Sequence, residues 1–196
     1  LYDPTRPQGI PWPKETDDLL YRTVLPRHFA EAANPSGVSH TVVVEASVWV
    51  ADNDWILDLA TNEPAIVGFV GNLDPDQDDY IPTLDRLSAN PLFRGVRLRR
   101  KELDRVADPD ILSAIKKLAD RDLEMDLLVN PPEMPTVGAI AKTIPDLRIV
   151  VNHVAHVLID GNAPDPEWVV GLKALAAFPN IYMKVSGFVE RSKQRP

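Results

Sequence analysis

The sequence contains no cysteine, which excludes a disulfide framework, a thiolate nucleophile and a thiolate-bound metal. No apolar run approaches the roughly 18–20 residues that cross a bilayer, and no charged segment leads into an apolar one as in a signal peptide. Neither G-x-G-x-x-G nor G-x-x-x-x-G-K-[ST] occurs, so a phosphate-binding glycine loop is not indicated. Any chemistry must therefore come from His, Asp, Glu, Lys, Arg, Ser or Tyr side chains.

Basic residues are also in the minority. The chain has 21 Lys and Arg residues against 29 Asp and Glu residues, which gives a net charge of −8 and a pI near 5.0. This balance disfavours nucleic-acid binding, which usually needs a basic face. The 196 residues, 44% hydrophobic and 26% charged, suffice for one core of an ordinary globular domain. We expect a cytoplasmic protein with a small-molecule substrate and no nucleic-acid or membrane partner; a homo-oligomer and a monomer are both compatible with the sequence.

Short β-branched runs alternate with helix-like segments along the chain. The expected strands are residues 40–46 (HTVVVEA), 65–72 (AIVGFVGN), 94–98 (RGVRL), 123–129 (LEMDLLV), 147–153 (LRIVVNH) and 181–186 (IYMKVS). Most are too apolar to leave one face in water, as in parallel strands covered by helices. The expected helices are residues 53–60, 79–88, 109–121, 134–143 and 166–177, and the pairs Asp108-Pro109 and Asp165-Pro166 are typical helix starts.

This alternation predicts successive βα units, which build either a closed (β/α)8 barrel or an open doubly wound sheet. Polar residues follow the strands at their carboxyl ends: Glu45 and Ser47, Asn72 and Asp74, Arg97 and Arg99, Asn130, His153, and Lys184 and Ser186. In an α/β barrel these ends form the active-site face. Because no glycine-rich phosphate loop is present, we predict an α/β protein of the (β/α)8, TIM-barrel-like class, with about six βα units in the chain.

Four motifs occur at the spacing of barrel units: GFVGNLDP at residues 68–75, NPLFRGVRLR at 90–99, DLRIVVNHVAH at 146–156 and FPNIYMKVSG at 178–187. Together they resemble the amidohydrolase-2 group of metal-dependent hydrolases, in particular its L-fuconolactonase and 2-pyrone-4,6-dicarboxylate lactonase types. The resemblance covers nearly the whole chain and implies a distorted TIM barrel. It implies that residues 1–196 are one incomplete domain, in which residues 1–39 form an N-terminal loop and helix and residues 40–196 carry the second to the seventh strands.

In that family an H-x-H pair lies on the first strand and an acidic motif ends the eighth. Neither motif occurs in this sequence. The first and eighth strands are neighbours in a closed barrel, so a six-strand version would expose two edges of a parallel sheet. We therefore expect the sequence to be part of a longer protein whose other segments supply the H-x-H pair and the final acid.

The resemblance places His153 at the family's sixth-strand histidine. It implies a catalytic imidazole that binds a metal or donates a hydrogen bond to the scissile carbonyl. The alternative is a buried histidine satisfied by a neighbouring backbone group. His156 is expected in a loop near the rim, within reach of substrate, whereas His28 and His40 are expected to be structural.

Arg97 is the second expected site residue. Its guanidinium presents a rigid fork that can hold a carboxylate through two hydrogen bonds, and the resemblance implies this use in relatives that act on acidic lactones. Val96 and Leu98 should pack against helices, so alternation directs Arg97 and Arg99 inward. The alternative is a solvated arginine within the run RLRRK.

Glu45 and Ser47 share a face by the same alternation. A buried glutamate needs a partner, so an inward Glu45 implies Arg97 or a metal, and we predict Glu45 and His153 as tentative metal ligands, with a structural ion pair as the alternative for Glu45. Ser47 is expected to reach substrate.

Asn72 and Lys184 complete the expected substrate-binding residues. Lys184 would face the pocket as a cation or pair with Glu45. Asp74 precedes Pro75 and is better explained as a turn residue. Four aromatic residues, Tyr2, Trp12, Trp49 and Trp55, are either core residues or a wall for a sugar-like ring.

The resulting hypothesis is a hydrolase that opens a small carboxylate- or hydroxyl-bearing lactone by activated water. The resemblance implies one divalent metal, zinc by preference, with metal-independent catalysis as the alternative. Three competing hypotheses are a metal-dependent decarboxylase of the same superfamily, a non-catalytic barrel binding protein, and a doubly wound nucleotide-binding protein.

Overall fold

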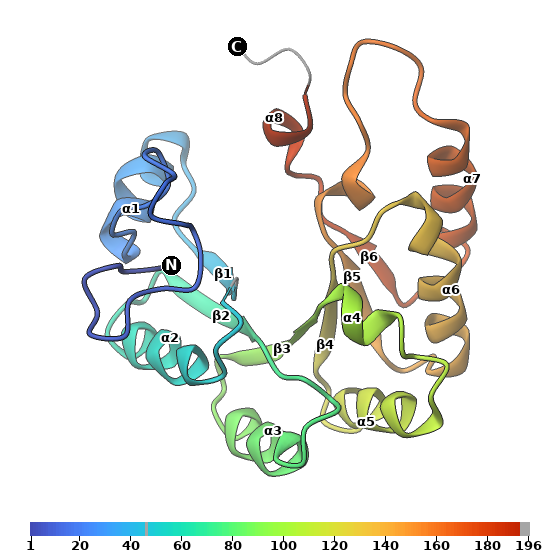
Figure 1. Ribbon diagram of the computed structural model, residues 1–196, viewed down its shortest axis with the longest axis horizontal. Coiled ribbons are helices and arrows are strands. Elements are labelled where there is room, and N and C mark those ends of the chain that lie inside the picture. The colour runs from blue at the N-terminus through green and yellow to red at the C-terminus, as the bar shows by residue number, and fades with distance from the viewer. Residues whose placement is uncertain (46, 193–196) are drawn as a thin grey trace. The chain divides into compact units, whose positions relative to one another are not determined.

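The computed structural model describes residues 1–45 and 47–192, in which six strands are each followed along the chain by a helix (Figure 1). The strands are β1 (Thr41–Val44), β2 (Ile66–Gly71), β3 (Phe93–Leu98), β4 (Glu124–Leu127), β5 (Arg148–Val151) and β6 (Ile181–Met183). The α-helices are α1 (Pro26–Ala33), α2 (Ala51–Thr61), α3 (Tyr80–Ser88), α4 (Arg100–Leu103), α5 (Pro109–Ala119), α6 (Met134–Thr143), α7 (Pro166–Leu175) and α8 (Phe188–Arg191). All six expected strands are therefore present, although Ala46, at the end of the first, lies outside the described residues.

The strand order is β1-β2-β3-β4-β5-β6, and the strands with a defined register run parallel. From β3 to β6, one row of partners is Arg97, Asp126, Val150 and Tyr182. Side chains in one row of a parallel sheet point to the same face, and neighbouring strands are about 4.8 Å apart. Arg97 and Asp126 are therefore neighbours on one face.

The opposite face of β3, β4 and β5 is apolar. Its side chains are each at most 1% exposed: Val96, Leu98, Met125, Leu127, Ile149 and Val151. Helices α5, α6 and α7 lie along this part of the sheet (Figure 1). Burying one side chain of this size contributes roughly 1.5–3 kcal/mol, so the apolar face holds the strands and leaves the polar face available for a site.

The two expected N-caps are confirmed. The Asp108 carboxylate accepts a hydrogen bond from the backbone N–H of Asp110 at 3.0 Å, and the Asp165 carboxylate accepts one from Glu167 at 2.7 Å. Each cap satisfies a backbone donor that the helix leaves unpaired. The sequence did not indicate α4, which begins within the run RLRRK, or the short turn η3 (His153–His156) after β5.

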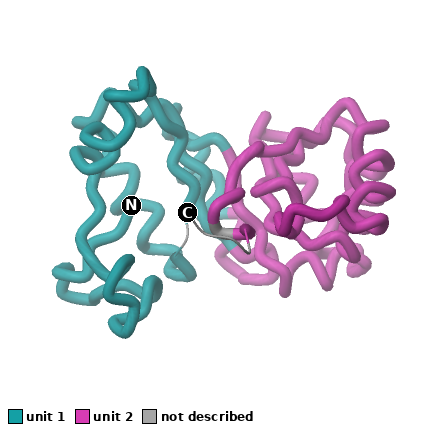
Figure 2. The backbone as a smooth tube through the Cα atoms, turned by 90° about the horizontal axis from the view of Figure 1, so that it is seen from above, with its two compact units in different colours: residues 1–73, 82–94 teal, residues 74–81, 95–196 magenta. Residues whose placement is uncertain are grey.

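The chain divides into two compact units (Figure 2). Unit 1 contains Leu1–Leu73 and Pro82–Arg94, and unit 2 contains Asp74–Ile81 and Gly95–Pro196. The organisation of residues 1–196 as one incomplete barrel domain stays a prediction. Within the described ranges, no helix has the length and apolar character needed to cross a membrane.

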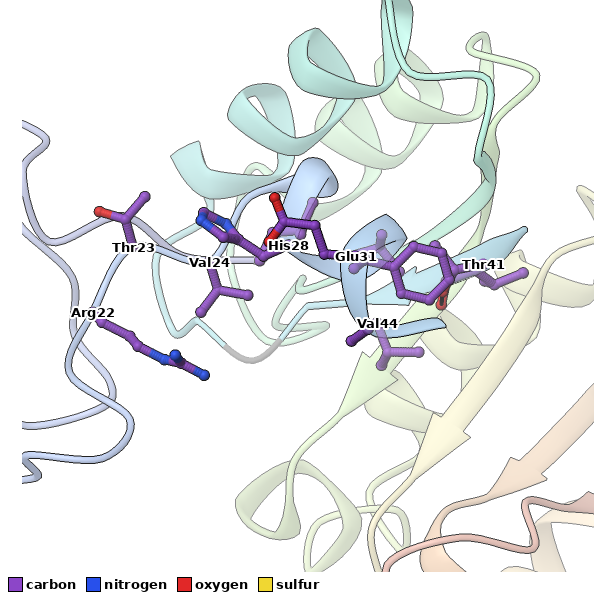
Figure 3. A pocket seen from close by; sticks show the side chains of 12 residues that line it. Arg22, Thr23, Val24, His28, Glu31, Thr41 and Val44 are labelled. Carbon is purple, nitrogen blue, oxygen red and sulfur yellow. Dashed lines mark hydrogen bonds between the residues drawn. The ribbon is translucent and has the colours of Figure 1, made fainter. Parts of the chain in front are cut away.

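Unit 1 has a hollow of about 710 Å³ beside β1 and α1, lined by Arg22, Val24, His28, Glu31 and the residues of β1 (Figure 3). His28 has a local role there, because its Nδ1 accepts a hydrogen bond from the backbone N–H of Leu25 at 2.9 Å, at the start of α1. This agrees with the structural role expected from the sequence. The residues predicted to bind substrate do not line this hollow.

Candidate active site

A cationic pocket lies in unit 2 at the carboxyl ends of β3 and β4. Its volume is about 240 Å³, and its lining residues are Arg97, Leu98, Arg99, Arg100, Leu128, Asn130 and His156. The lining contains three guanidinium groups and, among the described residues, no carboxylate. Because the whole chain carries a net charge of −8, this concentration of arginine is local and favours an anion.

The pocket wall is held by two carboxylates behind it. Glu133 forms an ion pair with Arg100 at 2.7 Å and accepts a hydrogen bond from the backbone N–H of Asn130, also at 2.7 Å. Glu102 accepts from the backbone N–H of Arg99 at 2.7 Å. Both glutamates are buried, so the backbone positions of the pocket residues are fixed from within the protein.

Asp126, the register partner of Arg97 in the sheet, is a buried carboxylate that the sequence analysis did not single out. It lies in the middle of β4, is fully buried, and pairs with Lys184, which follows β6. Within the described residues, its Oδ1 atom has no hydrogen-bond partner. The available signal was a carboxylate between two apolar residues, Met125 and Leu127, in the run LEMDLLV, because an unpaired buried charge is costly.

Lys184 was expected to face the pocket as a cation or to pair with Glu45. The ion pair that the structure gives is instead with Asp126, across the intervening strand β5. The Lys184 side chain is 34% exposed, so its ammonium group also reaches solvent. Its role toward substrate stays a prediction.

The turn η3 has an unusual backbone. His153, Val154, Ala155 and His156 all have positive φ values, of 52°, 45°, 50° and 53°. The left-handed conformation costs an L-residue roughly 1–2 kcal/mol, and a β-branched residue such as Val154 rarely adopts it. The four residues together therefore store roughly 4–8 kcal/mol of local strain.

Contacts from three later segments hold this turn. The backbone N–H of Val154 donates to the Lys184 carbonyl at 3.0 Å, and the Trp168 indole N–H donates to the Val154 carbonyl at 2.8 Å. Arg191 donates to the His156 carbonyl at 3.1 Å. Strained residues persist where the surrounding structure fixes them in this way, and they are concentrated at functional sites.

The turn brings the two histidines together. Their rings are parallel within 3°, with centroids 6.3 Å apart. His153 Nδ1 is hydrogen-bonded to the Ser186 hydroxyl at 2.9 Å, and His156 Nδ1 to Asn130 Oδ1 at 3.3 Å. His153, which the sequence analysis placed at the end of a strand, is thus next to His156, and His156 lines the cationic pocket.

These residues do not by themselves fit a metal centre. The described ranges contain no group of three or more His, Asp or Glu side chains able to hold an ion, whereas a catalytic zinc needs about three protein ligands. Parallel imidazole planes also keep the in-plane lone pairs of His153 and His156 from converging on one point. Glu45, the other tentative ligand, belongs to unit 1, so a shared site with His153 stays a prediction.

In unit 1, the residues expected at the site make local backbone contacts. The buried Glu45 carboxylate accepts from the backbone N–H of Ser47 at 2.5 Å, and the Ser47 hydroxyl accepts from Trp49 at 3.0 Å. Asn72 exchanges two backbone hydrogen bonds, each 2.9 Å long, with the side-chain amide of Asn53 on α2. These bonds fix the loops after β1 and β2, and substrate binding by Glu45, Ser47 or Asn72 stays a prediction.

Three of the four tryptophan and tyrosine residues considered for an aromatic wall lie in one cluster with Arg6. Tyr2 and Trp12 meet edge to face at 5.9 Å, and the Arg6 guanidinium lies 4.2 Å from the centre of the Trp55 ring. Arg6 also pairs with Asp52 at 2.6 Å. The cavity that these residues line together is about 10 Å³, enough for one water molecule, whereas Trp12 is 47% exposed. A wall for a sugar-like ring stays a prediction.

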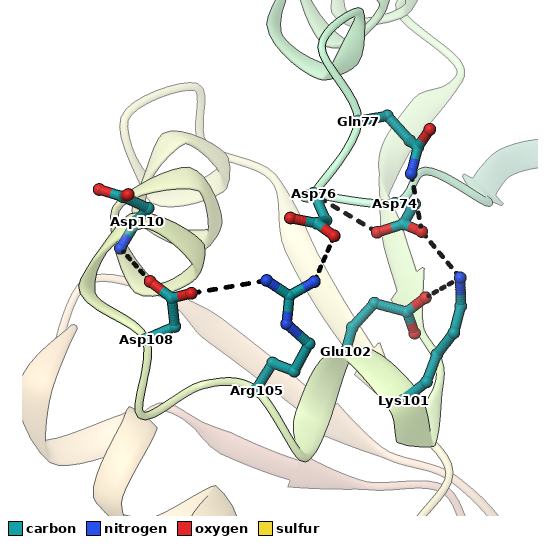
Figure 4. Close-up of polar contacts among 8 residues, drawn as sticks. All are labelled: Asp74, Asp76, Gln77, Lys101, Glu102, Arg105, Asp108 and Asp110. Atoms are coloured by element: carbon teal, nitrogen blue, oxygen red, sulfur yellow. Dashed lines mark hydrogen bonds and ion pairs between the residues drawn. The ribbon is translucent and has the colours of Figure 1, made fainter.

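A network of charges surrounds α4 in unit 2 (Figure 4). Lys101 pairs with Asp74 at 2.7 Å and with Glu102 at 3.1 Å, and Arg105 bridges Asp76 and Asp108. Partial burial raises the pKa of Asp74, but the hydrogen bonds from Lys101 and from the backbone of Asp76 outweigh it and hold that pKa below its ordinary value. Asp74 is therefore a structural turn residue, as the sequence suggested.

Comparison with known proteins identifies the family. The amidohydrolase family model, Amidohydro_2, matches residues 5–196. An L-fucono-1,5-lactonase from Burkholderia ambifaria is 33% identical over 188 residues, which are 94% of this chain and 64% of that protein. The chain thus spans less than two thirds of the length of this curated relative.

Solved structures share the fold. A crystal structure of an amidohydrolase from Burkholderia multivorans matches with a TM-score of 0.85 and 22% identity, covering 98% of this chain and 69% of that one; the same protein has also been solved with zinc bound. A probable 2-pyrone-4,6-dicarboxylic acid hydrolase from Acinetobacter baumannii, solved with citric acid bound, matches with a TM-score of 0.69 and 18% identity, covering 87% and 63%. The six parallel βα units are accordingly those of a TIM-barrel-like fold, and with the family match across nearly its whole length the chain belongs to the amidohydrolase family.

Proposed function

We propose that this amidohydrolase hydrolyses a small lactone that carries a carboxylate, and that the carboxylate binds in the cationic pocket of unit 2. The observation that carries the proposal is the lining of that pocket, with the guanidinium groups of Arg97, Arg99 and Arg100 beside Asn130 and His156. Guanidinium groups bind carboxylates through paired, charge-assisted hydrogen bonds. The volume of about 240 Å³ suits a single small ring rather than a drug-sized ligand.

The neighbouring groups suit the chemistry of ring opening. Water adds to the lactone carbonyl carbon, the bond between that carbon and the ring oxygen breaks, and the ring oxygen takes up a proton. Negative charge develops on the carbonyl oxygen, where imidazole N–H donors stabilise it. His153 supplies such a donor, and Lys184, held by Asp126, adds a nearby positive charge.

The relatives support this class of substrate. The Burkholderia ambifaria relative is named for a lactone, and the Acinetobacter baumannii structure holds a tricarboxylate. The zinc in the Burkholderia multivorans protein suggests that the complete catalytic centre of this family can include a metal. When bound, zinc would polarise the carbonyl as a Lewis acid, but the residues described here make no closed site for it, and we assign them no step through it.

The proposal is tested by comparing two lactones with the purified protein. We expect 2-pyrone-4,6-dicarboxylate to be hydrolysed with a higher kcat/KM than the neutral L-fucono-1,5-lactone, measured by acid release with a pH indicator. Replacing Arg97 by methionine should lower kcat/KM for the dicarboxylate about 10- to 100-fold, because hydrogen bonds to charged groups contribute about 1.5–3 kcal/mol.

Arg94→Met is the matched control. Arg94 lies on the same strand but is exposed and donates to the Val67 carbonyl at 3.4 Å, so its loss should leave kcat/KM nearly unchanged. Equal effects of the two substitutions would remove Arg97 from the site. Turnover of neither lactone would contradict the lactonase assignment itself.

A further inference from the structure

The ring of His153 is fixed by a segment far along the chain. Its Nδ1 atom is hydrogen-bonded to the hydroxyl of Ser186, which lies 33 residues later, three residues after the end of β6. This hydrogen bond occupies Nδ1, so Nε2 is the ring nitrogen that it does not engage. The bond therefore determines which ring nitrogen is available for chemistry.

The next residue, Gly187, allows this contact. Its φ of 75° is in the left-handed region, and a Cβ at this position would lie 2.9 Å from His153 Cβ, 3.0 Å from Cγ and 3.1 Å from Nδ1. Any side chain here would have to displace the histidine. The backbone of Gly187 thus closes on one side of the imidazole while Ser186 binds its edge.

The same segment also holds the backbone of the residue after the histidine. The Lys184 carbonyl, two residues before Ser186, accepts a hydrogen bond from Val154 at 3.0 Å. The segment of residues 184–187 therefore contacts the turn through a carbonyl, a hydroxyl and a glycine. Two of these contacts are with the His153 side chain and one is with the backbone of the next residue.

We infer that Ser186 is a positioning residue, which with Gly187 fixes the ring orientation and the tautomer of His153; this inference rests on the proposed function. In this proposed arrangement the Ser186 hydroxyl donates to Nδ1, and the neutral ring carries its proton on Nε2. His153 then presents Nε2–H to the lactone carbonyl oxygen as a hydrogen-bond donor. A tautomer with the proton on Nδ1 would present a lone pair to that oxygen instead and could not stabilise its negative charge.

Nuclear magnetic resonance tests the inference without relying on turnover. Long-range ¹H–¹⁵N spectra of the ¹⁵N-labelled protein report which ring nitrogen carries the proton, and a His153→Gln variant assigns the His153 signals. We expect the Nε2–H tautomer in the wild type, a mixture of tautomers in Ser186→Ala, and recovery in Ser186→Thr, which restores a hydroxyl.

The chain supplies a matched control. His40 Nδ1 is hydrogen-bonded to the Ser39 hydroxyl at 2.8 Å, but both residues are exposed. Ser39→Ala should leave the His153 signals and the hydrolytic rate unchanged. A wild-type proton on Nδ1, or identical His153 spectra in wild type and Ser186→Ala, would overturn the inference.

The hydrolysis rate provides the second measurement. Loss of a hydrogen bond that orients a functional imidazole typically costs 10- to 100-fold, and we expect Ser186→Ala to lower kcat by about this factor, with recovery in Ser186→Thr. If the wild type hydrolyses neither lactone, the proposed function fails while the spectra still decide the role of Ser186. If the wild type is active and Ser186→Ala keeps full kcat, the positioning role fails while the proposed function stands.

Discussion

Replacing Gly187 by alanine should destabilise the protein more than the same replacement at Gly161. Both glycines belong to unit 2 and have similar φ values, 75° and 82°. Alanine pays the cost of the left-handed conformation at either position, roughly 1–2 kcal/mol. A Cβ on Gly161 would meet no atom within 4 Å, so this backbone cost is the whole expected effect there.

At Gly187 the added methyl group also meets His153. The nearest atom, at 2.9 Å, is the histidine Cβ, which cannot swing away as the end of a flexible side chain would. Forcing an extra carbon into a filled space typically costs 1–3 kcal/mol, so Gly187→Ala should lose roughly 2–5 kcal/mol in total. In a protein of this length, each kcal/mol lowers Tm by about 2–4 °C.

Urea unfolding followed by circular dichroism and by tryptophan fluorescence measures the two variants side by side. We expect a lower free energy of unfolding for Gly187→Ala than for Gly161→Ala, by roughly 1–3 kcal/mol. Equal losses would refute the close contact between Gly187 and the His153 ring, and with it the steric part of the argument for this segment.

Two further predictions concern ion pairs in unit 2. Lys184→Met should cost about 3–5 kcal/mol, because it leaves the fully buried Asp126 carboxylate without its partner, whereas Asp126→Asn should cost less, since Lys184 is 34% exposed and can turn toward water. Urea unfolding compares the two, and equal losses would contradict the argument from buried charge. The pKa of Asp74 is lower in the folded state than its ordinary value of 3.8, so the ionised carboxylate stabilises the fold at pH values above 3.8. This stabilisation is lost as the pH falls through the lower pKa of the folded state. Because Lys101 helps to lower that pKa, Lys101→Met should lose less stability in acid than the wild type does. Unfolding between about pH 7 and pH 2 tests this, and high salt should shrink the difference between variant and wild type, because Lys101 is 67% exposed.

The sequence predicted the strands well because their short β-branched and apolar runs leave a strong local signal. The run LRIVVNH, for example, contains the whole of β5 (Arg148–Val151), and the predicted boundaries exceed it by only a few residues. The inward direction of Arg97 followed from the same pattern, since Val96 and Leu98 are buried while Arg97 is half-buried and lines the pocket.

The pairings within the site were not predictable in the same way. Asp126 and Lys184 are 58 residues apart and meet across β5, so their contact depends on how three strands are placed relative to one another. Nothing in the letters HVAH indicates a left-handed turn, because they include neither glycine nor asparagine. That turn is determined by tertiary contacts with Lys184, Trp168 and Arg191, which local sequence cannot show.

The left-handed turn also indicates a substitution that could raise the stability of this protein. The hydrogen bonds that hold it use backbone groups of Val154 and His156, which another residue type at position 154 would also supply. Glycine or asparagine would tolerate a φ of 45° far better than valine. Next to its histidines the protein thus has a position where stability has not been maximised, as is common where activity depends on a constrained geometry.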